Sequence, residues 1–196
     1  SRRLTAAARR VAEAGWGTAG IDAPLPPAQD PVGIAGFGRI GRAVADRVSA
    51  RGFPVHVWAP FATDVPDAVP RHATLGELAA AVPHLTLHKL FVAETAGAVD
   101  ASVLAALGAG GHVVNTARGA LIDEDALLAA LDAGTLGFAS LDVLSSEPPT
   151  GVAARIAAHP RVLVNPHIAY LSTESLPQLR IRAAVRLAAL LEDAAR

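Results

Sequence analysis

The glycine-rich segment Gly36-Phe37-Gly38-Arg39-Ile40-Gly41 has the spacing of a turn that binds the pyrophosphate of a dinucleotide. It follows the apolar run of residues 32–35, which is typical of a buried strand, and it opens a helical pattern. Gly36 permits a tight turn, Gly38 lets the backbone approach a phosphate, and Gly41 lets the helix pack closely on the strand. Because free N–H groups at the helix start would face the anion, the segment predicts a dinucleotide site. The alternative is a glycine-rich turn without a ligand.

The sequence lacks the acidic residue that usually binds the adenosine ribose of the cofactor. That residue is expected about 20 positions after the glycines, at the end of the second strand. The sequence has Trp58-Ala59-Pro60 there, no arginine follows directly to bind a 2′-phosphate, and Arg71 is distant along the chain. We therefore expect NAD or NADP as the cofactor, with a slight preference for NAD.

Three further segments carry polar side chains directly after predicted strands. They are residues 115–119, residues 141–148 and residues 165–169. In an open α/β sheet, ligands bind in the crevice at the carboxyl ends of the strands, so these segments are candidate binding or catalytic sites. His84 and His88 are four positions apart, but no third ligand is near in the sequence, and we expect no metal site.

Strand-like and helix-like patterns alternate along the chain and define the elements that must position these residues. Predicted strands cover residues 32–35, 55–58, 85–87, 112–115, 138–143 and 162–164, and predicted helices cover 5–14, 39–51, 75–81, 100–107, 123–133, 152–158 and 175–194. This alternation predicts right-handed βαβ units and a parallel sheet with helices on both faces, a doubly wound α/β fold of the Rossmann type. We expect the apolar C-terminal helix to pack as core rather than to act as a membrane anchor.

Composition and charge exclude several classes of protein. The 196 residues contain no cysteine, which rules out disulfides, zinc–thiolate sites and cysteine nucleophiles. Seventeen basic and eighteen acidic residues leave a net charge of −1, which argues against a binder of nucleic acid or of anionic membranes. No apolar run approaches the roughly 18 residues of a membrane span, and no signal peptide is visible, so we expect a cytoplasmic protein. Methionine is also absent, which indicates a processed, trimmed or internal segment.

Four motifs in this order resemble the D-isomer-specific 2-hydroxyacid dehydrogenases, a family that also includes phosphite and formate dehydrogenases and the C-terminal-binding-protein corepressors. The motifs are the glycine turn, the N-T-A-R-G run at 115–119, the L-D-V…E-P run at 141–148 and the P-H-I-A run at 166–169. The stretch Ala169-Tyr170-Leu171-Ser172 looks closest to the corepressor-like branch. The resemblance implies a small-molecule 2-oxo or 2-hydroxy acid as substrate, and a homodimer built largely through this domain.

The resemblance also implies three catalytic residues. Arg118 would bind the carboxylate or carbonyl of the substrate, since its planar guanidinium suits two parallel hydrogen bonds. His167 would be the general acid and base, giving a proton to the carbonyl oxygen as the nicotinamide delivers hydride. Glu147 would orient the imidazole and favour its protonated form. Formate dehydrogenases have glutamine in the role of Glu147, so a formate dehydrogenase is disfavoured.

By the same resemblance, Asp142 would bind the carboxamide of the nicotinamide, and Thr116 and Ala117 would line that pocket. The full set of expected cofactor-binding residues is Gly36, Phe37, Gly38, Arg39, Ile40, Gly41, Trp58, Ala59, Thr116, Ala117, Arg118, Asp142 and His167.

The sequence departs from the family pattern at two places. Lys89-Leu90-Phe91-Val92 stands where the family has a Cys/Val-Pro-Leu-Thr-like turn. Lys89, the only lysine, could contact phosphate or substrate, or be an exposed loop residue, which we slightly favour. Residues 1–30 resemble the family's interdomain helix and linker, and residues 31–196 its dinucleotide-binding Rossmann domain. We therefore expect the family's substrate domain to be absent from this chain.

Three functions follow from these observations. The first is the nucleotide-binding domain of an NAD(P)-dependent 2-hydroxyacid dehydrogenase, which transfers hydride between the nicotinamide and a 2-oxo acid. The second is a catalytically silent module that senses NAD(H) or dimerises, as in the corepressor-like branch. The third is an enzyme similar to phosphite dehydrogenase.

Overall fold

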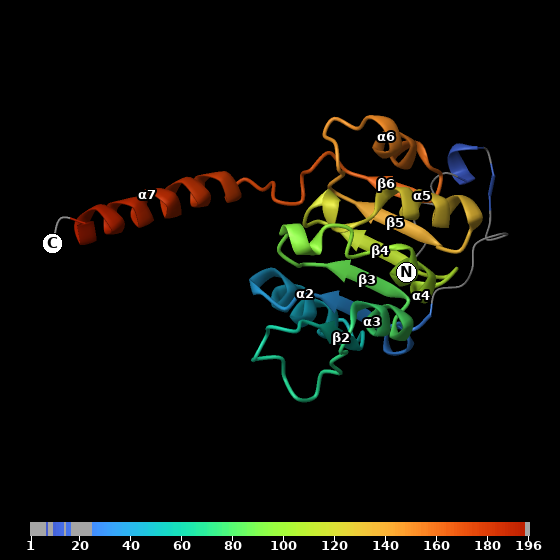
Figure 1. The fold of residues 1–196 in the computed structure, drawn as a ribbon, viewed down its shortest axis with the longest axis horizontal. Helices are drawn as coiled ribbons and strands as arrows, with labels where there is room; N and C mark the ends of the chain where they lie inside the picture. Colours follow the sequence, from blue (N-terminus) through green and yellow to red (C-terminus); the bar gives the residue numbers. More distant parts are fainter. Residues whose placement is uncertain (1–6, 8–9, 14, 17–24, 195–196) are drawn as a thin grey trace.

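Six parallel strands form one sheet in the order β2-β1-β3-β4-β5-β6 (Figure 1). The computed structural model describes residues 7, 10–13, 15–16 and 25–194. The strands are β1 (Val32–Ala35), β2 (Val55–Trp58), β3 (His84–Leu87), β4 (His112–Asn115), β5 (Phe138–Leu141) and β6 (Val162–Val164). All six predicted strands are confirmed, and β5 ends at Leu141, two residues before the predicted end. The chain leaves the sheet there, so Asp142 is the first residue beyond the strand.

Helices and short 3₁₀ turns connect the strands. The helices are α2 (Arg39–Ser49), α3 (Leu75–Ala81), α4 (Ala101–Leu107), α5 (Glu124–Ala133), α6 (Gly151–Ala158) and α7 (Ser175–Ala194), and the 3₁₀ turns are η1 (Pro27–Gln29), η2 (Ala93–Thr95) and η3 (Gly119–Leu121). Helix α2 ends two residues before the predicted end, because Gly52 with φ of +83° turns the chain toward β2. Half of the residues of the helix predicted over residues 5–14, and part of the linker after it, lie outside the described residues.

Side chains cap three of the helices. The hydroxyl of Thr74 accepts a hydrogen bond from the N–H of Glu77 at 3.1 Å. The carboxylate of Asp123 accepts from the N–H of Ala126 at 3.0 Å. At α4, the Asp100 carboxylate accepts from the hydroxyl and N–H of Ser102 and from the N–H of Val103. These bonds satisfy N–H groups that a helix start otherwise leaves unpaired, which fixes where each helix begins.

Helices cover both faces of the sheet, which confirms the predicted Rossmann-type fold. Helices α3, α4, α5 and α6 pack against one another in succession and form one layer. Helix α2 packs on β1 and β2 from the other face, because the strand order reverses at β1 and right-handed crossovers then lie on opposite sides. The larger core fills the space between the sheet and the α3–α6 layer; its fully buried side chains include Leu78, Leu85, Leu104, Val113, Leu127, Leu131 and Ile156.

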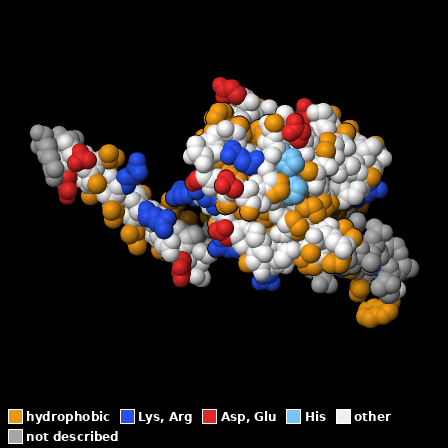
Figure 2. All heavy atoms as spheres, turned by 90° about the horizontal axis from the view of Figure 1, so that it is seen from below, with side chains coloured by type: hydrophobic (Ala, Val, Ile, Leu, Met, Phe, Trp, Pro, Cys, Tyr) orange, Lys and Arg blue, Asp and Glu red, His pale blue; other side chains and the backbone are white. Residues whose placement is uncertain are grey.

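Helix α7 stands out from the domain (Figure 1) and exposes its apolar side chains (Figure 2). Its large exposed hydrophobic residues are Leu176, Leu179, Ile181, Val185, Leu187, Leu190 and Leu191. The expectation that this helix packs as core is therefore wrong. The sequence pattern identifies an apolar helix, but it does not say which surface covers that helix. Among the described residues, no helix combines the length and apolar character that a membrane span requires.

Asp100→Ala should lower the free energy of unfolding by about 1 kcal/mol, because it removes the cap of α4. Asp100→Asn should cost less, since the amide oxygen can still accept from the helix N–H groups. Urea unfolding followed by circular dichroism measures both. The matched control is Asp67→Ala, at an exposed turn residue. Equal stability of Asp100→Ala and the control would contradict the capping role.

Candidate active site at the carboxyl edge of the sheet

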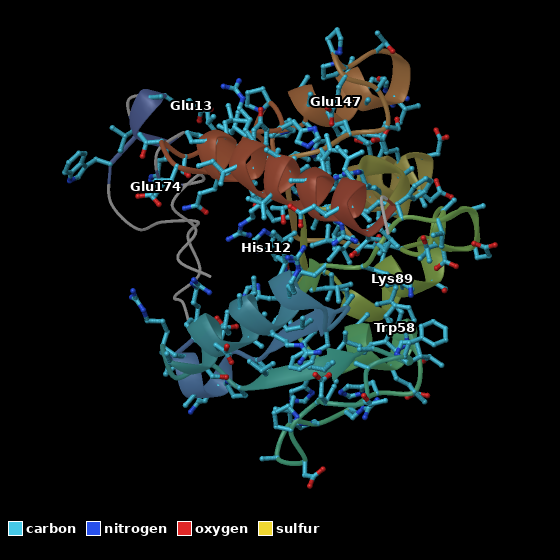
Figure 3. The ribbon with its side chains drawn as sticks, turned by 90° about the vertical axis from the view of Figure 1, so that its left-hand side faces the viewer. Glu13, Trp58, Lys89, His112, Glu147 and Glu174 are labelled. Atoms are coloured by element: carbon cyan, nitrogen blue, oxygen red, sulfur yellow. The ribbon has the colours of Figure 1, made fainter. Side chains whose placement is uncertain are left out.

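The six strands end nearly in register, so the loops that follow them emerge at one edge of the sheet. Ala35 is the register partner of both Trp58 and Leu87, and Leu87 in turn pairs with Asn115. Leu141 continues the row between Asn115 and Val164. The edge therefore brings together the glycine turn, the loop after β2 and the three polar segments that the sequence singles out. Figure 3 views the domain from the side on which α7 projects, with Glu147 at the top and Trp58 beside Lys89 at the right.

The glycine turn has the geometry that phosphate binding requires. Gly36 has φ of +102°, and a side chain there would meet the carbonyl oxygen of His88 at 2.7 Å. A Cβ on Gly41 would overlap the carbonyl oxygen of Gly36. At Gly38 a Cβ would meet nothing within 4 Å, and no side chain caps the start of α2. Gly36 and Gly41 let the strand, the loop and the helix approach one another closely. Gly38 leaves the N–H groups at the start of α2 open to an anion.

Arg71 lies at the loop after β2, although it is distant along the chain. Its guanidinium donates hydrogen bonds to the carbonyl oxygens of Ala59 at 3.4 Å and Ala62 at 2.9 Å. An isolated parallel bridge between Val57 and Arg71 brings the chain back beside β2. The distance of Arg71 along the chain sets it aside in the sequence, because a single bridge leaves no alternating pattern that would place it beside β2.

Lys89 is half-buried, which corrects the expectation of an exposed loop residue. Its ammonium lies 4.8 Å from the centre of the Trp58 ring and 5.6 Å from that of the Phe61 ring. Both rings present their electron-rich faces to the cation, an arrangement that holds a lysine side chain in one place.

Asn115 shapes the turn that carries Arg118. The fully buried amide of Asn115 accepts from the N–H of Ala117 at 3.0 Å and donates to the carbonyl of Arg118 at 2.8 Å. Gly119 is required next, because a Cβ there would overlap the backbone of Leu144. The Arg118 side chain is exposed and uses one N–H on the carbonyl of Ala117, which leaves most of its donors available for an anion.

Asp142 holds the loop that carries His167. Its buried carboxylate accepts the N–H of Ile168 through one oxygen and the N–H of Ala169 through the other, both at 2.9 Å. The carbonyl of Asp142 also accepts the N–H of His167, whose φ is +53°. The binding of the cofactor carboxamide by Asp142 stays a prediction. The positioning role of Asp142 leaves no signal in the sequence, because it depends on how the fold brings residues 142 and 167–169 together.

Glu147 and His167 form a hydrogen-bonded pair. The Nδ1 atom of His167 lies 2.8 Å from Oε2 of Glu147, and the second carboxylate oxygen accepts the N–H of Leu144 at 3.3 Å. With Nδ1 donating to the carboxylate, Nε2 is the ring nitrogen left for a substrate. Both side chains keep about two-fifths of their surface exposed, at 41% for His167 and 42% for Glu147. The hydrogen bond from His167 is the main cause that lowers the pKa of the Glu147 carboxyl.

A parallel sheet with a glycine turn after its first strand and open helix N–H groups defines a Rossmann dinucleotide-binding domain. The sequence profile described as D-isomer specific 2-hydroxyacid dehydrogenase, NAD binding domain, matches residues 1–169. The chain belongs to this family, and it is the NAD-binding domain. This confirms the resemblance that the four motifs indicate.

Similar proteins support the same assignment. Glyoxylate/hydroxypyruvate reductase A of Klebsiella pneumoniae is 39% identical over 140 residues, which are 70% of this chain and 45% of that protein. D-3-phosphoglycerate dehydrogenase of Bacillus subtilis is 36% identical over 156 residues, 79% of this chain and 29% of that protein. A D-isomer specific 2-hydroxyacid dehydrogenase of Xanthobacter autotrophicus, solved with NADPH and MES, is 30% identical with a TM-score of 0.80, covering 96% of this chain and 77% of that one. The chain thus spans less than half the length of the first two relatives.

His167→Ala should raise the pKa of the Glu147 carboxyl toward the ordinary glutamate value, because the carboxylate loses its donor. In the wild type, the stabilisation from this pair is present above the ordinary pKa and is lost as the pH falls through the lowered one. NMR titration of ¹³C-labelled carboxyl groups measures both values. Tyr170→Phe, which keeps a ring beside His167, is the control. The same Glu147 pKa in wild type and His167→Ala would show that the pair does not form.

Proposed function

We propose that the protein containing this chain interconverts a 2-oxo acid and a 2-hydroxy acid with NAD(P)H. The observation that carries the proposal is the Glu147–His167 pair, which Asp142 holds at the same edge as the glycine turn. The residues at this edge fit a dinucleotide, since Gly38 leaves an open approach to the start of α2. The family is described by an NAD binding domain, and NADPH is bound in the Xanthobacter relative, so the comparisons support either nicotinamide cofactor here.

Each residue has a distinct role in the proposed reaction. The cofactor, when bound, supplies a hydride to the carbonyl carbon of the substrate. His167 gives the proton on Nε2 to the carbonyl oxygen, and the reverse reaction returns it. Glu147 keeps the ring oriented and stabilises its protonated form through Nδ1. Arg118 binds the carboxylate of the substrate through its free N–H groups.

The proposal extends to the organisation of the whole protein. We assign residues 31–196 to the dinucleotide-binding unit and residues 1–30 to a connecting helix and linker. The groups that close the site over the substrate would come from the portion of the relatives that this chain does not match. We also propose a cytoplasmic homodimer that does not bind nucleic acid or membranes, in line with the net charge of −1.

The exposed apolar side of α7 favours a second function. Seven large hydrophobic residues on this helix have no cover within the described part of the chain. A catalytically silent module that changes its assembly when it binds NAD(H) would use such a helix. Sedimentation with and without saturating NADH tests this function, and an unchanged oligomeric state counts against it.

His167→Ala should lower kcat for 2-oxo acid reduction by about 10² to 10⁴, because it removes the proton donor. The dissociation constant for NADH should change less than about threefold, since Gly38 and α2 are untouched. Stopped-flow and steady-state assays over a panel of 2-oxo acids measure the rates, and calorimetry the affinity. Glu174→Gln, in the same connecting stretch, is the control. The assay uses the whole protein that contains this chain, and a wild type that binds NADH but reduces none of the panel would leave the silent module as the better function.

Gly38→Ala should weaken dinucleotide binding by at least about tenfold while leaving the melting temperature within about 2 °C. A Cβ at this position meets no protein atom, so the fold tolerates it, but it occupies the approach of the pyrophosphate. Calorimetric titration and thermal melting measure the two effects. Gly110→Ala, at another glycine with free space, controls for the added methyl group. Unchanged affinity would place the dinucleotide elsewhere.

A further inference from the structure

The loop after β2 offers no acceptor to the ribose of a bound dinucleotide. In a Rossmann domain, a carboxylate at the end of the second strand hydrogen-bonds the ribose 2′-hydroxyl of NAD. Here that position is Ala59, and residues 58–62 contain no side chain that can accept a hydrogen bond from a hydroxyl. Asp64, the next acid along the chain, forms an ion pair with Arg42. A 2′-hydroxyl at this loop would therefore lack the acidic partner that NAD-selective domains supply.

Two cations flank the same loop from different elements. Lys89 follows β3, and its backbone lies against the glycine turn. A Cβ on Gly36 would come within 2.9 Å of the backbone nitrogen of Lys89. Its ammonium is held over Trp58, the last residue of β2, and near Phe61. Among the residues that the structure describes, none forms an ion pair with Lys89.

Arg71 reaches the loop from the other direction. One guanidinium nitrogen donates to the carbonyl oxygens of Ala59 and Ala62, which holds the group at the loop and leaves its other nitrogens available. Arg42 differs from these two cations, because Asp64 already neutralises it. Lys89 and Arg71 are thus positive groups kept at the end of β2 without an acidic partner among the described residues.

The 2′ position of the adenosine ribose is the place where NADP(H) and NAD(H) differ chemically. A phosphate monoester on that ribose carries a charge of about −1.5 to −2 near neutral pH, whereas a hydroxyl carries none.

We propose that the 2′-phosphate of NADPH binds between Lys89 and Arg71 at the loop after β2, so that this domain prefers NADP(H) to NAD(H). The proposal rests on the proposed function, since it concerns the same dinucleotide site. It reverses the slight preference for NAD that the sequence alone suggests. Lys89 supplies the selectivity. Its ammonium loses part of its hydration against the two aromatic rings, and the phosphate oxygens then replace that water as hydrogen-bond acceptors.

Titration of the purified protein with NADPH and with NADH, by calorimetry at low ionic strength, tests the proposal. NADPH should bind at least about tenfold more tightly than NADH. Lys89→Gln should weaken NADPH by about 10-fold to 100-fold, the range for a hydrogen bond to a charged group, and should change NADH less than about threefold. Arg71→Gln should act in the same direction. Arg51→Gln, which removes a charge beyond the far end of α2, is the matched control.

Two nucleotide fragments locate the effect. Adenosine 2′,5′-bisphosphate should bind more tightly than ADP to the wild type, and Lys89→Gln should abolish that difference. Equal affinity for NADPH and NADH, or an equal loss of both in Lys89→Gln, would overturn the proposal, because Lys89 would then contact the shared pyrophosphate or base. Binding of neither dinucleotide by the wild type would overturn the proposed function itself, and this inference with it.

Discussion

The functional residues of this domain depend on one constraint, which is that six parallel strands end in register at a single edge. A parallel strand can follow another only after a crossover returns the chain to the amino edge. Every loop at the carboxyl edge is therefore free to differ in length and sequence from its neighbours. Gly36, Lys89, Arg118 and His167 lie more than 130 positions apart at the extremes, yet they follow strands of the same sheet.

Buried polar groups convert these strand ends into fixed loops. Asn115 and Asp142 are both removed from solvent, and an unpaired polar group in that environment would cost several kcal/mol. Each instead accepts backbone N–H groups, at about 0.5–1.5 kcal/mol for the bond to the neutral Asn115 amide and about 1.5–3 kcal/mol for each bond to the Asp142 carboxylate. The same bonds that make burial tolerable also determine where Arg118 and His167 lie.

Local patterns in the sequence predict most of the strands and helices, and they predict contacts between residues that are close in the sequence. Strand runs, the caps Thr74 and Asp123, and the glycine turn all depend on neighbours within a few positions. The Glu147–His167 bond was expected from the order of family motifs, and the structure forms it. Arg71 beside Ala59 and Lys89 over Trp58 arise from packing between elements, which no spacing in the sequence encodes. The exposure of α7 was missed for the same reason.

Helix α7 begins eight residues after His167, and at 1.5 Å per residue its 20 residues extend about 30 Å. Hydrogen bonds from Leu171 to Ile168 and from Ser175 to Ser172 stiffen the stretch between them. The helix is joined to the rest of the domain through this stretch, so the angle of the stretch decides where the far end of the helix lies. A rotation of about 10° at its base would move that end by about 5 Å.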